Sequence, residues 1–102
     1  MPSRLESEIE KRVCKQATLE GWWALKLVCN GHRGFPDRWF IRSNVGDNQP
    51  TIVLMEFKAP GKRARKLQEW VCQRLEDIGF NVHRNVDDYS MAMEILREHD
   101  EV

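Results

Sequence analysis

The sequence predicts one α/β domain in which a mixed β-sheet is flanked by helices, and three observations lead to this class. Two long segments carry apolar residues at helical spacing, and each ends at a glycine. Four shorter segments are rich in apolar residues and are separated by turns or helices. A helix between the third and fourth of these segments makes a βαβ unit, so we expect that pair of strands to be parallel, with a right-handed crossover.

The helices are predicted from their apolar stripes and end signals. The first runs from about Ser3 to Glu20, before Gly21, and its stripe consists of Leu5, Ile9, Val13 and Ala17. The second runs from about Arg63 to Ile78, before Gly79, and its stripe consists of Leu67, Val71, Leu75 and Ile78. Asp87 is a good N-cap for a last helix that extends to about Glu98. The expected order is α-β-β-β-α-β-α.

The strands are predicted from short apolar runs between turn signals. These are WWALKLVC (22–29), DRWFIRS (37–43), TIVLMEFK (51–58) and FNVHRNV (80–86). The continuous apolar run of the third strand implies burial on both faces of the sheet. The turn sequence NVGDNQ favours a hairpin between the second and third strands.

Length and composition limit the class of protein. A chain of 102 residues supports one domain over residues 1–102, and its zero net charge argues against a strongly basic nucleic-acid coat. It has no apolar run of about 20 residues and no signal-like start, so we expect a cytoplasmic protein without a membrane partner. Cys14, Cys29 and Cys72 are expected to be reduced thiols, and Cys29-x-x-His32 lacks the second pair that a zinc site needs.

The end of the third strand carries the first sign of chemistry. Alternation places Glu56 and Lys58 on the same face, with α-carbons about 6.6 Å apart. Pro36 fixes the backbone before Asp37, which opens the neighbouring strand. In a hairpin, Asp37 and Glu56 can lie side by side. Two adjacent carboxylates stay ionised readily only with a cation between them, and oxygen ligands suit Mg²⁺ or Mn²⁺. A nearby lysine then favours phosphodiester hydrolysis.

These residues resemble a known nuclease pattern. PD, followed after a turn by EFK, resembles the PD-(D/E)xK nuclease superfamily. The stretches GFPDRW, MEFKAPGK and KLQEW resemble its virus-type replication-repair nuclease (VRR-NUC) family in a stand-alone form, over nearly the whole chain. The resemblance implies a restriction-endonuclease-like αβββαβα core. It also implies a homodimer, which would present two active sites to a four-way DNA junction.

The resemblance further implies roles for individual residues. Asp37 and Glu56 would bind the metal together with the carbonyl of Phe57, Lys58 would be the catalytic lysine, and Gln68 would lie near the water or the scissile phosphate. A glutamate of the first helix would complete the site, and Glu6 and Glu10 are both candidates. Glu6 falls on the apolar stripe and Glu10 at its margin, which favours Glu6. However, Ser3-x-x-Glu6 and Ser7-x-x-Glu10 both fit a capping box.

Basic residues around these motifs are candidates for nucleic-acid binding. Lys62, Arg63, Arg65 and Lys66 would lie at the start of the second helix, where they oppose its macrodipole and can meet a phosphate. His32 and Arg33 lie in the loop that leads to Asp37. The tryptophans are expected in the core or at a subunit interface rather than as platforms for bases.

The sequence therefore predicts a Mg²⁺- or Mn²⁺-dependent endonuclease that recognises DNA structure rather than base sequence, because the chain has no room for a separate recognition domain. Branched or four-way-junction DNA is the expected substrate. Two alternatives stay open, a non-catalytic nucleic-acid-binding or assembly module and an RNA nuclease with the same core.

Overall fold

The computed structural model describes residues 4–27, 34–43 and 49–99. Over these residues the element order is the predicted one, α-β-β-β-α-β-α. The elements are α1 (Arg4–Leu19), β1 (Trp23–Lys26), β2 (Arg38–Arg42), β3 (Thr51–Phe57), α2 (Lys66–Ile78), β4 (Asn81–Val86) and α3 (Tyr89–Glu98). The α/β class is thereby confirmed.

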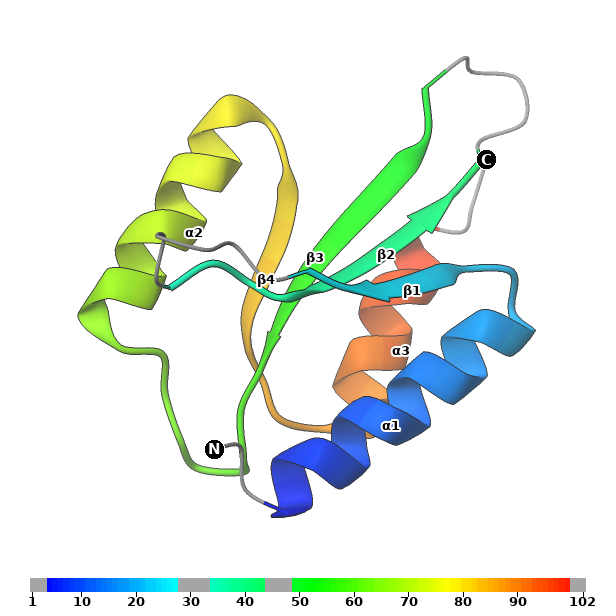
Figure 1. Cartoon of the computed structure of the whole chain (residues 1–102), viewed down its shortest axis with the longest axis horizontal. Coiled ribbons are helices and arrows are strands. Elements are labelled where there is room, and N and C mark those ends of the chain that lie inside the picture. Colours follow the sequence, from blue (N-terminus) through cyan, green and yellow to red (C-terminus); the bar gives the residue numbers. More distant parts are fainter. Residues whose placement is uncertain (1–3, 28–33, 44–48, 100–102) are drawn as a thin grey trace.

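The described strands form one mixed sheet in the order β1-β2-β3-β4. The pairs β1–β2 and β2–β3 are antiparallel, whereas β3 and β4 are parallel, as the βαβ order predicted. Helix α2 covers one face of the sheet, and α1 and α3 lie together on the other face (Figure 1). The sheet is therefore the middle layer of a three-layer domain.

Strand β3 is the centre of the core. Its residues from Val53 to Phe57 are all buried, which confirms the burial predicted from the apolar run. Alternation divides them between the two faces: Val53 and Met55 pack with α1 and α3, and Leu54 packs with α2. Removing a side chain from such a position costs about 2–5 kcal/mol. The site at the end of β3 is thus built on a rigid strand.

Helix α2 begins three residues later than predicted. Its N-cap is Arg65, and the residue before it is held by a side chain of β4: Ala64 N–H donates to Oδ1 of Asn85 at 2.6 Å. The predicted start at Arg63 is therefore wrong, because Arg63 precedes the cap. Gly79 ends α2 with a φ of 119°, in the left-handed region where glycine is favoured.

The other two helices differ from their predicted ends by one residue. Helix α3 is capped by Asp88, whose carboxylate accepts from Met91 N–H at 3.1 Å, and the prediction of Asp87 as the cap is wrong. Helix α1 is already formed at Arg4, so Ser7 lies inside the helix and cannot be its N-cap. Ser3 lies outside the described residues.

The apolar stripes are buried only in part. Val13, Ala17, Val71 and Leu75 are buried as predicted. However, Leu5, Leu67 and Ile78 are 57%, 48% and 68% exposed. Leu67 and Ile78 therefore leave apolar surface on α2, and Leu5 leaves some on α1. None of the described helices is long and apolar enough to cross a bilayer.

Candidate functional site

The hairpin of β2 and β3 brings Asp37 next to Glu56, as expected from the turn sequence between the two strands. Arg38 pairs with Met55 in the antiparallel register, and one step further along the same register Asp37 faces Glu56. The backbone around Asp37 is fixed, because Pro36 is fully buried and Leu27 N–H donates to the Asp37 carbonyl at 2.8 Å. The Asp37 side chain itself is 43% exposed and is therefore accessible to a ligand.

Gly34 allows the segment before Asp37 to lie directly against α2. Its φ is 86°, and a Cβ built at this position would approach Leu67 Cγ at 3.1 Å and the backbone N of Gln68 at 3.3 Å. A side chain here would be strained by the backbone conformation and crowded by the helix. The glycine of the GFPD motif therefore keeps Asp37 and Gln68 close to the same end of the sheet.

Glu56 is the buried centre of this arrangement, with 8% of its surface exposed. Gln68 donates from Nε2 to its Oε1 at 3.0 Å, and Lys58 Nζ lies 3.7 Å from the same oxygen. The other carboxylate oxygen, Oε2, is buried and has no hydrogen-bond partner among the described residues. Buried polar atoms are seldom left unsatisfied, so Oε2 marks a place where a ligand would be favourable.

The electrostatics of Glu56 agree with its geometry. Burial raises the pKa of the Glu56 carboxyl from 4.5 to about 7; Lys58 opposes this shift, and the negative charges of Asp37 and Glu6 add to it. Without a counter-charge, this carboxylate is therefore only partly ionised near neutral pH. A positively charged ligand between Asp37 and Glu56 would offset the electrostatic repulsion between the two carboxylates.

A divalent cation fits this donor set. Asp37 and Glu56 supply carboxylate oxygens, and the Phe57 side chain is buried in the core, which leaves its backbone carbonyl as the only ligand that it could offer. All these donors are oxygens, the ligands that Mg²⁺ and Mn²⁺ prefer. Among the described residues, no three His, Cys, Asp or Glu side chains form a metal-ligand cluster. The predicted metal ligands are two carboxylates and one backbone carbonyl, so they do not require three such side chains.

The two glutamates of α1 differ in their surroundings. Glu10 is bonded to Arg38, and its Oε2 lies 3.9 Å from Lys26 Nζ, in a partly buried ion-pair group. Glu6 lies close enough to Glu56 to raise its pKa. The N-terminal end of α1 lies near the end of β3 (Figure 1). The structure therefore brings Glu6 within electrostatic range of Glu56, and it links Glu10 to Asp37 through Lys26.

Two residues beside the site were missed by the sequence analysis. Lys26 of β1 pairs in register with Arg38, and its Nζ lies 3.9 Å from Oδ2 of Asp37. Lys26 is thus a counter-charge for Asp37. Arg38, the first residue of β2, connects that strand to α1 through its ion pair with Glu10. The position of Lys26 beside Asp37 follows from the register of β1 against β2, and the sequence gives no clear signal of that register.

A bulge in β4 anchors the basic segment, which we define as residues 62–66. Met55 pairs with His83 but Phe57 pairs with Val86, so β4 contains one extra residue. Asn85 has a φ of 58° in this bulge, and its side chain accepts the N–H of Ala64. Lys62, Arg63, Arg65 and Lys66 are all exposed. His32 and Arg33, also predicted to contact nucleic acid, lie outside the described residues.

A scan against protein-family models found no match for this chain, and no curated protein matched it either. The case for a nuclease therefore depends on the motif residues and on their positions in the fold.

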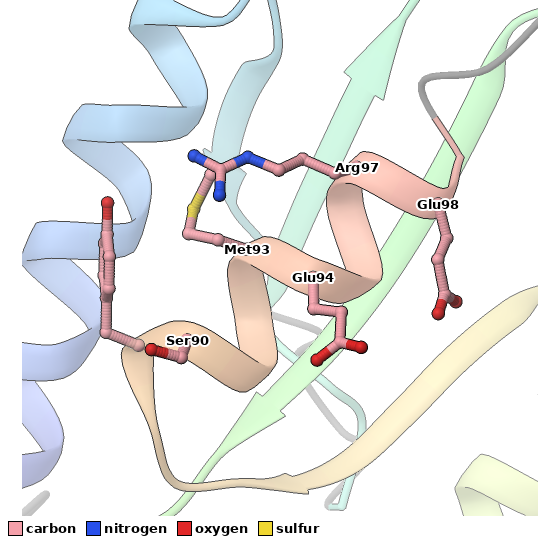
Figure 2. A pocket seen from close by; sticks show the side chains of 6 residues that line it. Ser90, Met93, Glu94, Arg97 and Glu98 are labelled. Atoms are coloured by element: carbon pink, nitrogen blue, oxygen red, sulfur yellow. The ribbon is translucent and has the colours of Figure 1, made fainter.

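A wide hollow on α3 is separate from this arrangement. It has a volume of about 470 Å³ and is lined by Tyr89, Ser90, Met93, Glu94, Arg97 and Glu98. Figure 2 shows Arg97 extending toward α1 while Glu94 and Glu98 project away from it. Arg97 is bonded to Glu20 at 2.8 Å, which ties α3 to the end of α1. The hollow lies across the sheet from α2 and contains none of the predicted site residues.

Proposed function

We propose that this chain is a metal-dependent, structure-selective DNA endonuclease with a restriction-endonuclease-like core of the stand-alone VRR-NUC type. The observation that carries the proposal is the environment of Glu56. A buried carboxylate with a raised pKa and a partnerless oxygen lies beside Asp37, with Lys58 and Gln68 in contact. Such perturbed groups cluster at functional sites.

Each residue of this site has a separate proposed role in catalysis. A bound Mg²⁺ or Mn²⁺ would neutralise the two carboxylates and polarise a phosphate oxygen. Lys58 places an ammonium group beside Glu56, from which it can donate to a phosphate oxygen or orient the attacking water. Gln68 holds one oxygen of Glu56 in place and leaves Oε2 for the ligand. Glu6 adds negative charge that strengthens cation binding.

The proposed substrate is branched or four-way-junction DNA. The exposed basic segment lies between β3 and α2, at the strand end that carries Glu56, where it can contact the backbone without reading bases. We further propose that the chain acts as a homodimer, which would give a two-fold junction two active sites. Both statements extend the motif resemblance.

The deciding experiment is cleavage of labelled junction, flap and linear duplex DNA with Mg²⁺, Mn²⁺ or EDTA. We expect metal-dependent cutting that is fastest on branched DNA and is lost in Glu56→Gln and Lys58→Ala. Glu94→Gln, an exposed change on α3, is the matched control and should keep full activity. Cutting that persists in EDTA or in Glu56→Gln would contradict the proposal.

Two other functions are separated by the same assay. A non-catalytic binding module would bind branched DNA without nicking it under any metal. An RNA nuclease would cut structured RNA faster than the matching DNA. The grouping of Asp37, Glu56 and Lys58 at one end of the β2–β3 hairpin favours an enzyme, because a binding module has no need for a buried carboxylate with a raised pKa.

A further inference from the structure

An apolar pocket lies against α2, close to the proposed active site. It has a volume of about 260 Å³ and is lined by Phe35, Trp70, Val71, Arg74, Leu75 and Ile78. Two of its residues, Trp70 and Ile78, are 59% and 68% exposed. We call this the α2 pocket. An open hollow with two aromatic walls is suited to a flat, apolar-faced ligand.

The charge at the α2 pocket is positive. Arg74 is the only charged residue among those lining it, and its Cζ lies 5.3 Å from the centroid of the Trp70 ring. The two acids that follow it in the chain have other partners: Glu76 is bonded to Arg84, and Asp77 accepts from Gln73 at 3.0 Å. An aromatic surface with an adjacent guanidinium matches the chemistry of a nucleotide, whose base can stack while its phosphate meets the cation.

The α2 pocket shares its framework with the proposed active site. Phe35 is two residues before Asp37, in the segment that Gly34 holds against Gln68. Along α2, Arg74 lies about 9 Å beyond Gln68 at 1.5 Å per residue. A DNA strand with a phosphate at Glu56 and Lys58 can therefore reach the pocket within a few nucleotides.

We propose that the α2 pocket binds an unpaired nucleobase of the strand that is cut, so that the preferred substrate has an unpaired base beside the scissile phosphate. A base inside a duplex is stacked on both faces and cannot contact Trp70 with its ring, whereas an unpaired base can leave the stack at low cost. This inference rests on the proposed nuclease function for the place of the phosphate.

The main rival occupant is a second copy of the chain. A two-fold interface centred on the pocket would set the same surface against itself, and would bring two Arg74 side chains together with no acidic residue in the lining. That arrangement is electrostatically unfavourable. The lining charge therefore favours a polyanion over a second copy.

The test is a binding titration of the full chain in EDTA, which prevents metal-dependent cutting. The two probes are labelled duplexes that differ only by one unpaired adenine. Trp70→Ala removes the stacking surface, Trp70→Phe restores an aromatic ring, and Trp23→Ala is the matched control at an exposed tryptophan of β1. Thermal unfolding and sedimentation of each variant report the fold and the oligomeric state.

We expect wild type to prefer the duplex with the unpaired base. Trp70→Ala should weaken binding to that duplex about 5- to 100-fold and bind the paired duplex as wild type does. Trp70→Phe should retain most of the preference, and Trp23→Ala all of it. An equal loss on both duplexes, or no loss on either, would overturn the proposal. So would a shift of Trp70→Ala from dimer to monomer with an equal loss on both probes.

This titration, together with the cleavage assay with Mg²⁺ or Mn²⁺ on the same two duplexes, separates this inference from the proposed function. If base-dependent binding is present but no metal supports cleavage, the nuclease proposal fails and the pocket assignment stands. If metal-dependent cleavage is present but binding and cutting are indifferent to the unpaired base, the pocket assignment fails alone.

Discussion

Gln68 connects the start of α2 to the buried carboxylate of Glu56. Its Nε2 donates to Glu56 Oε1 at 3.0 Å, while its Oε1 accepts the N–H of Arg65 at 2.8 Å. One side chain thereby caps the helix and orients the carboxylate. The helix position and the geometry of the site are consequently coupled.

Replacing Gln68 should affect both stability and the site. Gln68→Ala removes the acceptor at the helix start, which should cost about 1 kcal/mol of unfolding free energy. It also removes a donor that favours the ionised carboxylate, so the pKa of Glu56 should rise further and the pH dependence of metal-dependent cleavage should move to higher pH. Gln73→Ala, an exposed change on the same helix, is the control. An unchanged pH profile in Gln68→Ala would show that the contact does not tune Glu56.

The charge of Glu56 should destabilise the metal-free protein. Its pKa rises from 4.5 to about 7 on folding, so the folded state holds the proton that the unfolded state loses between these values. Stability should therefore fall as pH rises from about 4.5 to about 7 and then level off, by an amount on the order of 3 kcal/mol. In EDTA, Glu56→Gln should be more stable than wild type at pH 8 and similar at pH 5.

Thermal unfolding measured across pH tests whether the ionised Glu56 destabilises the metal-free protein. Glu94→Gln, on the exposed surface of α3, is the matched control. The control should follow the wild-type curve. If Glu56→Gln is the less stable protein at pH 8, then the ionised carboxylate is already compensated within the chain.

Much of this fold was predictable because the sequence carries local signals for it. The apolar run of β3 and the βαβ order were sufficient for the central strand and its parallel partner. The pairing of Asp37 with Glu56 followed from a hairpin whose turn residues are clear. Helix starts were less predictable, because α2 is capped by Gln68 through a contact that also depends on Glu56.

The parts that sequence could not provide depend on contacts between distant elements. Lys26 reaches Asp37 only through the register of β1, and the β4 bulge places Asn85 beside Ala64 across 21 positions of the chain. The exposed ends of the helical stripes, such as Ile78, depend on which positions of each helix pack against the sheet. None of these has a local pattern, since each is decided by tertiary packing.

Glu6 and Glu10 should respond to substitution in opposite ways. Glu10→Gln leaves Arg38 without its carboxylate in a partly buried group, with a side chain only 16% exposed, and should cost up to about 3 kcal/mol of stability. Glu6→Gln removes a charge that raises the pKa of Glu56, so the expected effect is on metal-dependent cleavage, which should be reduced. Denaturant unfolding and cleavage rates, measured on both variants, show which of the two glutamates acts in cleavage. A larger loss of cleavage in folded Glu10→Gln would reverse the assignment.

Asn85 should position the basic segment rather than only stabilise β4. Asn85→Gly keeps the left-handed backbone but loses the bond to Ala64, and should cost about 1 kcal/mol. Asn85→Ala adds backbone strain and should be less stable than Asn85→Gly. With the segment released, Asn85→Gly should raise the KM for DNA more than it lowers kcat. Equal effects on KM and kcat would point to general loosening of the strand.

The basic segment should set the salt dependence of DNA binding. Each side chain that neutralises a phosphate adds about 0.9 to the slope of log affinity against log salt concentration. The double change Arg63→Gln with Lys66→Gln should therefore lower that slope by about two, with similar losses of affinity on different base sequences. Lys15→Gln, an exposed change on α1 across the sheet, is the control and should leave the slope unchanged. Titrations at several salt concentrations in EDTA give the slopes. Equal slopes for wild type and the double variant would place the DNA backbone on another surface.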